Sequence, residues 1–131
     1  MLKMLRTSDG RNAMTNEEAF QISAKHLLKQ GRRATVKGNC SYRTPHGAMC
    51  AIGVLIPDDE YNPDFENMWV SNIYSKVSTL APLDLTMLDR LQDIHDNSAP
   101  YEWRSELAEA ACEFGFDEGF LAPDSVLNLL E

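Results

Sequence analysis

The sequence has few cysteines, no long apolar run and no motif that identifies a common enzyme class. Its three cysteines are too few and too widely spaced for the disulfide framework of a small secreted protein, so we expect reduced thiols. The longest apolar run, residues 48–56, is too short for a membrane helix, which needs about 20 residues. Residues 1–14 lack the apolar centre of a secretory signal, which predicts a cytoplasmic protein without membrane contact.

A glycine-rich phosphate loop, a nucleophile elbow and an EF-hand loop are also missing. What is present is the composition of an ordinary globular protein, with 44% hydrophobic and 24% charged residues in a chain of 131. A chain of this length forms one hydrophobic core. We therefore predict a flexible arm over residues 1–14 and a single helical domain over residues 15–131.

Charge is distributed unevenly along the chain, whose formal net charge is −8. Residues 1–49 carry nine lysines or arginines and three acidic residues, whereas residues 50–131 carry three and seventeen. The two halves could simply face each other in the fold. Alternatively, the acidic half would present a field that repels nucleic acid and attracts basic protein surfaces.

Helical patterns cover most of the chain. Thr15 and Glu18 form a capping box ahead of a helix predicted for residues 16–30, and Gly31 supplies its stop. Further helices are predicted to start near Pro63, Asp84, Pro100 and Pro123.

The helix after Pro63 would place Phe65, Trp69 and Ile73 on one apolar face. Between it and the first helix, residues 34–42 alternate ahead of a turn-type cluster at 44–47, which predicts a small β-hairpin. The run 49–56 is apolar on every side, so its period fits a buried strand or a short buried helix, and we favour the helix. The predicted fold class is mainly α, or α+β with one minor β-hairpin, with about five helices around a single core.

Cys40, His46 and Cys50 lie within eleven residues and straddle the predicted turn. Thiolates and imidazoles are zinc ligands, and the arms of a hairpin can bring such ligands together. The fourth ligand is missing locally, and His95, Cys112 or Asp96 would supply it only through the fold. The alternative, which we favour, is that both cysteines are small buried hydrophobes and His46 is an exposed turn residue, so that no cofactor is expected.

Cys50 is also a candidate nucleophile, because a helix that begins there would favour its thiolate. His95 would be the base, and Asp58 or Asn97 would orient it, since Asp96 follows His95 directly and would point elsewhere. The alternative is that His95 is a core histidine bonded to the backbone. A single cysteine and histidine are too common a pair to specify catalysis, so a binding protein is favoured over an enzyme.

Asp89, Asp93 and Asp96 fall on one face of the helix that starts near Asp84. Such a face would bind a divalent cation or a basic partner, or imitate the phosphate spacing of nucleic acid, although solvated helix faces are often this acidic. A second candidate binding group is the acidic run Asp58, Asp59 and Glu60.

Direct contact with RNA or DNA would depend on the basic half of the chain. The residues involved would be Arg32, Arg33, Lys37, Tyr42 and Arg43. This patch is small, and a chain with a pI near 4.8 lacks the overall basic character of a typical DNA-binding protein. Nucleic-acid binding is therefore the less favoured alternative.

Two segments carry a resemblance to a known group of proteins. Residues 42–61 read YRTPHGAMCAIGVLIPDDEY, and residues 91–96 read LQDIHD. This combination resembles a family of small proteins encoded by phages and prophages, over about residues 15–116. The shared residues are packing and turn residues, so the resemblance implies a phage origin and no particular activity.

A phage origin implies action inside an infected cell, where small accessory proteins bind host machinery. We therefore predict an acidic accessory protein that binds and inhibits a host protein or protein complex, such as a nucleic-acid-handling defence or polymerase complex. The binding would depend on charge complementarity with the acidic half. The alternatives are an enzyme that uses Cys50 and His95, with or without a metal, and a small RNA- or DNA-binding module.

Overall fold

The computed structural model describes residues 14–121. Its first helix, α1, spans Asn16–Gln30 and confirms the predicted bounds. The Thr15 hydroxyl accepts the Glu18 N–H at 3.1 Å, and the Glu18 carboxylate accepts the Thr15 N–H at 2.9 Å. Gly31 ends the helix with a φ of 71°, a conformation that a side chain would disfavour. The predicted flexible arm, apart from Met14, and the helix after Pro123 lie outside the described residues.

A β-hairpin follows α1, but its turn is not the one predicted. Strand β1 spans Thr35–Val36 and pairs antiparallel with β2, Asn39–Cys40. The chain reverses at Lys37 and Gly38, which both have positive φ, as a two-residue hairpin turn requires. The predicted turn at 44–47 closes a separate, single bridge between Arg43 and Met49.

The apolar run 49–56 forms neither a strand nor the favoured α-helix. Only Gly53–Leu55 is helical, as one turn of 3-10 helix. A Cβ on Gly53 would lie 2.0 Å from the carbonyl oxygen of Tyr42, so only glycine permits this close approach of two backbones. The run is apolar because it is buried in this irregular form and packs against α1.

The predicted helix after Pro63 is broken into two pieces. Pro63–Asn67 is a 3-10 helix, and α2 begins after it and spans Val70–Tyr74. The break at Met68 and Trp69 changes the helical phase, so Phe65 and Ile73 are buried while Trp69 is 81% exposed. The prediction that Trp69 shares their apolar face is therefore wrong.

Helices α3, Leu85–Asn97, and α4, Trp103–Glu113, confirm the last two predicted helices within the described residues. The Asp84 carboxylate accepts the Thr86 N–H at 2.9 Å and caps α3. A short 3-10 helix, Pro100–Glu102, leads into α4. Gly115, with a φ of 74°, lies just after α4, in the left-handed conformation that is common at helix ends.

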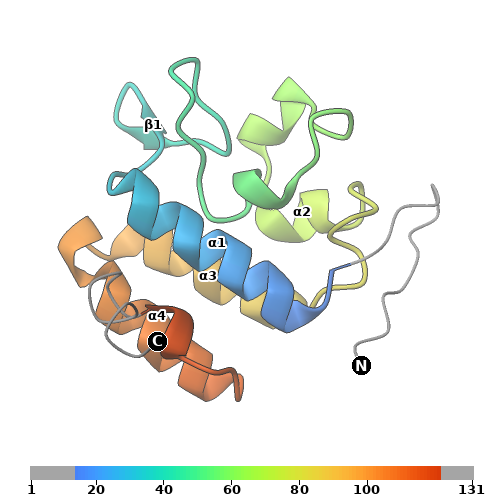
Figure 1. Ribbon diagram of the computed structural model, residues 1–131. Helices are drawn as coiled ribbons and strands as arrows, with labels where there is room; N and C mark the ends of the chain where they lie inside the picture. Colours follow the sequence, from blue (N-terminus) through green and yellow to red (C-terminus); the bar gives the residue numbers. More distant parts are fainter. Residues whose placement is uncertain (1–13, 122–131) are drawn as a thin grey trace.

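The three longer helices pack together and form most of the core. Helix α1 lies across α3 and α4, and the hairpin, the irregular run and α2 cover the other side of α1 and α3 (Figure 1). The largest buried side chains include Phe20, Leu27, Leu88, Trp103 and Leu107, each of which contributes about 1.5–3 kcal/mol when fully buried. This confirms the mainly helical fold with a minor two-stranded hairpin.

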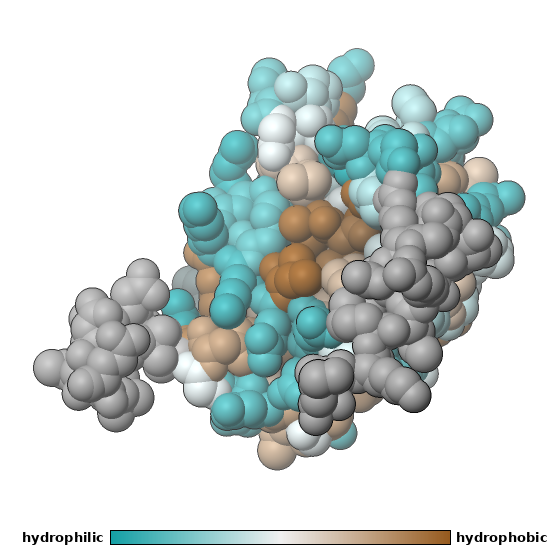
Figure 2. Space-filling model, turned by 45° about the vertical axis from the view of Figure 1, so that its right-hand side comes forward, coloured by the Kyte–Doolittle hydropathy of each residue, from teal (hydrophilic) through white to brown (hydrophobic). Residues whose placement is uncertain are grey.

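The outer surface is mostly polar. Figure 2 shows one face, on which hydrophilic side chains surround a small group of apolar ones. Among the described residues, none of the helices is both long enough and apolar enough to cross a bilayer.

Candidate functional site

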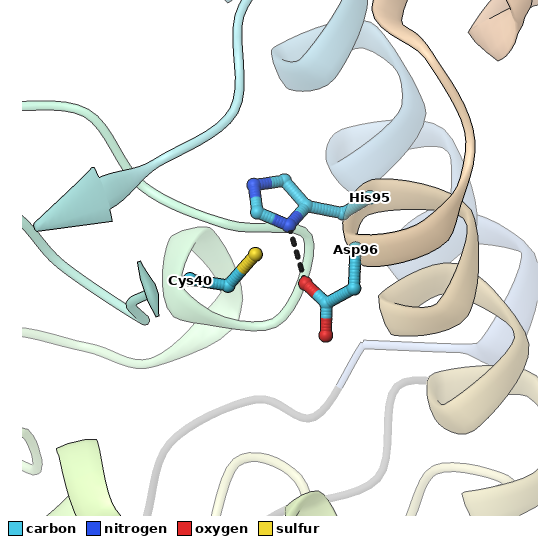
Figure 3. Close-up of side chains that lie close together, drawn as sticks. All are labelled: Cys40, His95 and Asp96. Atoms are coloured by element: carbon cyan, nitrogen blue, oxygen red, sulfur yellow. Dashed lines mark hydrogen bonds and ion pairs between the residues drawn. The ribbon is translucent and has the colours of Figure 1, made fainter. Parts of the chain in front are cut away.

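Cys40, His95 and Asp96 form the only group of described residues whose side chains are placed to share a metal ion. Their ligand atoms all lie within 4.8 Å of one another. His95 and Asp96 come from the last turn of α3, and Cys40 reaches them from β2 (Figure 3). The adjacent residues His95 and Asp96 hydrogen-bond each other through His95 Nδ1 and Asp96 Oδ1, contrary to the prediction that Asp96 points elsewhere.

Both ring nitrogens of His95 are already used. The Ala34 backbone N–H donates to Nε2 at 3.0 Å, so the proton lies on Nδ1, which donates to Asp96 Oδ1 at 2.7 Å. The ring is fully buried and stacks on the indole of Trp103, with 5.7 Å between the ring centres. A metal ion or a substrate proton could reach His95 only if one of these bonds broke, which argues for a structural role.

Other bonds hold the same end of α3 in place. The Arg33 guanidinium donates to the carbonyl oxygens of His95 at 3.1 Å and Ser98 at 2.6 Å. The Trp103 indole N–H donates to the carbonyl oxygen of Ile94 at 3.1 Å. The last carbonyls of a helix lack intrahelical partners, and these side-chain donors act there together with the Ser98 N–H, which donates to the Ile94 carbonyl oxygen at 3.2 Å. We call Cys40, Ala34, His95, Asp96 and Trp103 the histidine cluster, which joins the hairpin to α3 and α4.

The thiols of Cys40 and Cys50 are poor nucleophiles. Burial, followed by the nearby Asp96 carboxylate, raises the pKa of Cys40 to about 11. The prediction that both cysteines are buried is wrong for Cys40, which is exposed at the edge of β2, and is confirmed for Cys50, which is completely buried. Burial raises the pKa of Cys50 to about 12. Its Sγ accepts the Gly53 N–H at 3.2 Å. The predicted zinc ligands Cys40, His46 and Cys50 do not come together within the described residues, and His46 is an exposed turn residue, as expected.

The acidic run Asp58 to Glu60 is used within the fold. Asp58 forms an ion pair with Arg43 at 2.8 Å, and the Arg43 guanidinium lies over the Tyr61 ring. The Glu60 carboxylate accepts hydrogen bonds from the hydroxyls of Ser78 and Thr79. The loop between the irregular run and α2 is thus held to Arg43 on one side and, through Glu60, to the segment after α2 on the other.

Two of the basic residues predicted to contact nucleic acid are also used internally. Arg33 bonds to the end of α3, and Arg43 pairs with Asp58 and donates to the Ile56 carbonyl oxygen at 2.5 Å. Tyr42 is buried, and its hydroxyl donates to the Met68 carbonyl oxygen at 2.7 Å. The predicted basic patch therefore retains Arg32 and Lys37 as its exposed cations.

The three aspartates of α3 line a hollow beside the start of α2. We call this hollow, with a volume of about 380 Å³, the acidic groove. Its other walls come from the first residues of α2 and from the polar side chains of α3 that lie between the aspartates. The lining residues are Trp69, Val70, Ser71, Asp89, Gln92, Asp93, Asp96 and Asn97.

The three carboxylates differ in how far the fold satisfies them. Asp96 Oδ1 accepts from His95 and from Gln92 Nε2, and the bond from His95 is the main interaction that lowers its pKa, against the opposing effect of burial. Asp93 accepts a bond from the Asn97 amide at 2.7 Å. Asp89 has no hydrogen-bond or ion-pair partner among residues 14–121, and partial burial raises its pKa. The groove thus contains an anionic group that lacks a counterpart.

The sequence identified the aspartates but missed Trp69. A uniform helix through residues 63–74 would bury this side chain, and only the change from 3-10 helix to α-helix turns it outward. The sequence marks where the first of these helices begins, since the Asn62 side chain accepts the Asp64 N–H at 2.9 Å ahead of Pro63, but it has no comparable signal for the end at Asn67. For an aromatic residue just after such a short helix, the helical period of the sequence does not determine whether the side chain is buried or exposed.

Comparison with known proteins gives no further guidance, since no family model, no curated protein and no solved structure matches this chain.

Proposed function

We propose that this protein is a binding module that captures a basic segment of a partner protein in the acidic groove. The observation that carries the proposal is the position of a largely exposed tryptophan, Trp69, beside three aspartates in one hollow. Tryptophan is enriched at the energetic centres of protein interfaces, where a large flat side chain is buried on binding. An exposed tryptophan in a hollow is therefore a better indication of a binding surface than acidic residues alone.

The charge of the groove favours a basic ligand. Asp89 lacks a partner among the described residues, and partial burial makes its ionised form less favourable. A positive side chain in the groove would supply the missing counterpart, whereas the phosphates of nucleic acid would be repelled. The spacing does not suit a single divalent cation, because the three carboxylates are not within 4.8 Å of one another.

The resemblance to phage proteins supplies a biological setting for this binding. Host proteins that handle nucleic acid carry basic surfaces, and an acidic groove that occupies such a surface would block it. Inhibition of a host protein or complex in the host cytoplasm is the form of the proposal that this setting favours. An enzyme that uses Cys50 and His95 is less favoured, because both side chains are buried and hydrogen-bonded within the fold.

The direct test is a titration with a basic peptide such as hexa-arginine, followed by tryptophan fluorescence. The protein has two tryptophans, of which Trp103 is completely buried and Trp69 is largely exposed. Binding in the groove should therefore change the emission of Trp69. We expect saturable binding that weakens as salt rises, because the contacts are between exposed charges.

Two double variants that remove the same charge distinguish binding in the acidic groove from attraction to the overall negative charge of the protein. Asp89→Asn with Asp93→Asn should weaken peptide binding roughly tenfold, since each exposed charge pair contributes up to about 1 kcal/mol. Asp64→Asn with Glu109→Gln removes the same charge from exposed positions outside the groove and should leave the affinity nearly unchanged. Equal weakening by both pairs, or no saturable binding of the wild type, would contradict the proposal.

A further inference from the structure

The acidic groove continues into a second hollow of about 190 Å³ on the side of the hairpin. Four residues line both hollows and form their junction, namely Trp69, Val70, Gln92 and Asp96. The junction is therefore bounded by the indole of Trp69 and by two side chains of α3 that carry hydrogen-bond acceptors. These acceptors restrict which basic side chain fits the junction.

The Asp96 carboxylate is held in a fixed orientation. Its Oδ1 accepts from His95 Nδ1 at 2.7 Å and from Gln92 Nε2 at 2.9 Å. The second oxygen points away from His95 (Figure 3). A carboxylate that is already oriented by neighbouring donors loses little conformational entropy when it accepts a further bond.

Gln92 contributes a second acceptor at the junction. Its Oε1 is buried and has no hydrogen-bond partner among the described residues. A buried acceptor without a partner is unfavourable in general. The Nε2 of the same amide already donates to Asp96 at 2.9 Å, so a donor from a ligand in the junction would complete the hydrogen bonding of Gln92.

We infer that the junction selects arginine over lysine, with the guanidinium stacked on Trp69 and donating to Asp96 and Gln92. This inference rests on the proposed function and specifies the side chain that the groove recognises. A guanidinium is planar and carries five N–H donors in one plane, so it can stack on an indole and donate to two acceptors at once. It is also more weakly hydrated than an ammonium group, which lowers the free energy needed to bring it into a hollow.

Two other cations fit this junction less well. The ammonium group of lysine is compact and strongly hydrated, and it has no flat face to place on the indole. A quaternary ammonium group has no N–H donor and is typically held by several aromatic rings. Among the lining residues Trp69 is the one exposed aromatic ring, because the Tyr42 ring of the second hollow is buried.

The test compares dye-labelled hexa-arginine, hexa-lysine and hexa-citrulline by fluorescence anisotropy on the full chain. Hexa-arginine should bind at least about fivefold more tightly than hexa-lysine at the same salt concentration. Citrulline keeps the planar shape but loses the charge, so hexa-citrulline should not bind measurably. Trp69→Ala should reduce the ratio of the arginine and lysine affinities to nearly one, mainly by weakening hexa-arginine.

Two further variants complete the design. Tyr101→Ala removes another highly exposed aromatic side chain, outside both hollows, and should leave the ratio unchanged. Gln92→Met removes the unpaired acceptor at similar volume and should weaken hexa-arginine a few-fold more than hexa-lysine. Unfolding in urea checks that each variant is folded.

The outcomes separate this inference from the proposed function. Equal affinities for hexa-arginine and hexa-lysine, both sensitive to Asp89→Asn with Asp93→Asn, would overturn the selection of arginine and leave basic-segment binding intact. A preference for arginine that survives both Trp69→Ala and Gln92→Met would also overturn it. Failure of both charged peptides to bind would overturn the proposed function itself.

Discussion

The histidine cluster and the acidic groove are adjacent, share Asp96 and use similar residue types, yet their polar groups are satisfied in opposite ways. In the cluster, both nitrogens of His95 have partners within the fold, and the ring is fully buried against Trp103. In the groove, Asp89 lacks a partner among the described residues and Trp69 is largely exposed. The histidine cluster has the residue types of a catalytic or metal site, but its hydrogen bonds indicate a structural role. The acidic groove is the better candidate for function.

The comparison teaches how to weigh a group of titratable side chains. A cysteine, a histidine and an aspartate within 4.8 Å of one another suggest a metal centre or a catalytic site. The hydrogen bonds decide against it, because a ligand or a general base needs a free lone pair and His95 has none left. Unsatisfied groups, not the mere proximity of reactive ones, mark the place where a partner is missing.

The largest effect that distinguishes the two regions should be on stability. His95→Ala would leave the buried Ala34 N–H unpaired, remove one of the two donors to Asp96 Oδ1 and open a cavity beside Trp103. We expect the free energy of unfolding in urea to fall by about 4 kcal/mol. Trp69→Ala in the groove, and His46→Ala in the exposed turn, should each change it by less than about 0.5 kcal/mol. A loss below about 1 kcal/mol for His95→Ala would contradict the structural role.

Asp96 belongs to both regions, and its substitution should have a smaller effect that depends on pH. The bond from His95 lowers the pKa of Asp96, so its ionised form stabilises the fold at pH values above the unfolded pKa of about 3.9. That stabilisation is lost as pH falls through the lower pKa of the folded state. Asp96→Asn should therefore be less stable than the wild type by about 1–2 kcal/mol at pH 7, and the difference should shrink in strong acid. If the difference in the free energy of unfolding between Asp96→Asn and the wild type stayed constant with pH, the stabilising role of the ionised Asp96 would be contradicted.

The reactivity of the cysteine thiols tests how close Cys40 lies to Asp96. Because the pKa of Cys40 is raised to about 11, iodoacetamide at pH 8 should modify it more than tenfold more slowly than an unperturbed thiol. The Asp96 carboxylate contributes to this shift, so Asp96→Asn should speed modification of Cys40 a few-fold. Buried Cys50 should react only after unfolding, whereas exposed Cys112 is the internal reference. Mass spectrometry of peptides measures each rate, and unchanged modification of Cys40 in Asp96→Asn would count against this geometry.

The sequence predicted the fold well where local signals are strong. The capping box at Thr15 and Glu18, the stop at Gly31 and the cap at Asp84 are each short-range interactions, and the helices that they start or end have the expected bounds. The chain from residue 34 to 69 was predicted less well. Its form depends on contacts between distant residues, such as the Gly53 Cα against the Tyr42 carbonyl, and no periodicity reports them.

The candidate site shows the same division between local and distant information. The spacing of Asp89, Asp93 and Asp96 on a helix is a local pattern, and the sequence placed them on one face. The pairing of His95 with Asp96, and the approach of Cys40 from the hairpin, depend on how α3 ends and where the hairpin packs. The exposure of Trp69 depends on the change from a 3-10 helix to an α-helix at residues 68 and 69, which the apolar period of the sequence does not report.

The smallest expected effect concerns Asp89 and has the opposite sign to that of Asp96. Partial burial raises the pKa of Asp89, so the folded protein binds a proton there more readily than the unfolded chain does. The ionised carboxylate therefore opposes folding at neutral pH, and this opposition disappears as pH falls below the unfolded pKa of about 3.9. Asp89→Asn should be slightly more stable than the wild type at pH 7, by at most about 0.5 kcal/mol, and should lose this advantage in acid. If Asp89→Asn were instead less stable than the wild type at neutral pH, the fold would already supply a partner for Asp89. The contrast between the acidic groove and the histidine cluster would then fail, because it depends most on this residue.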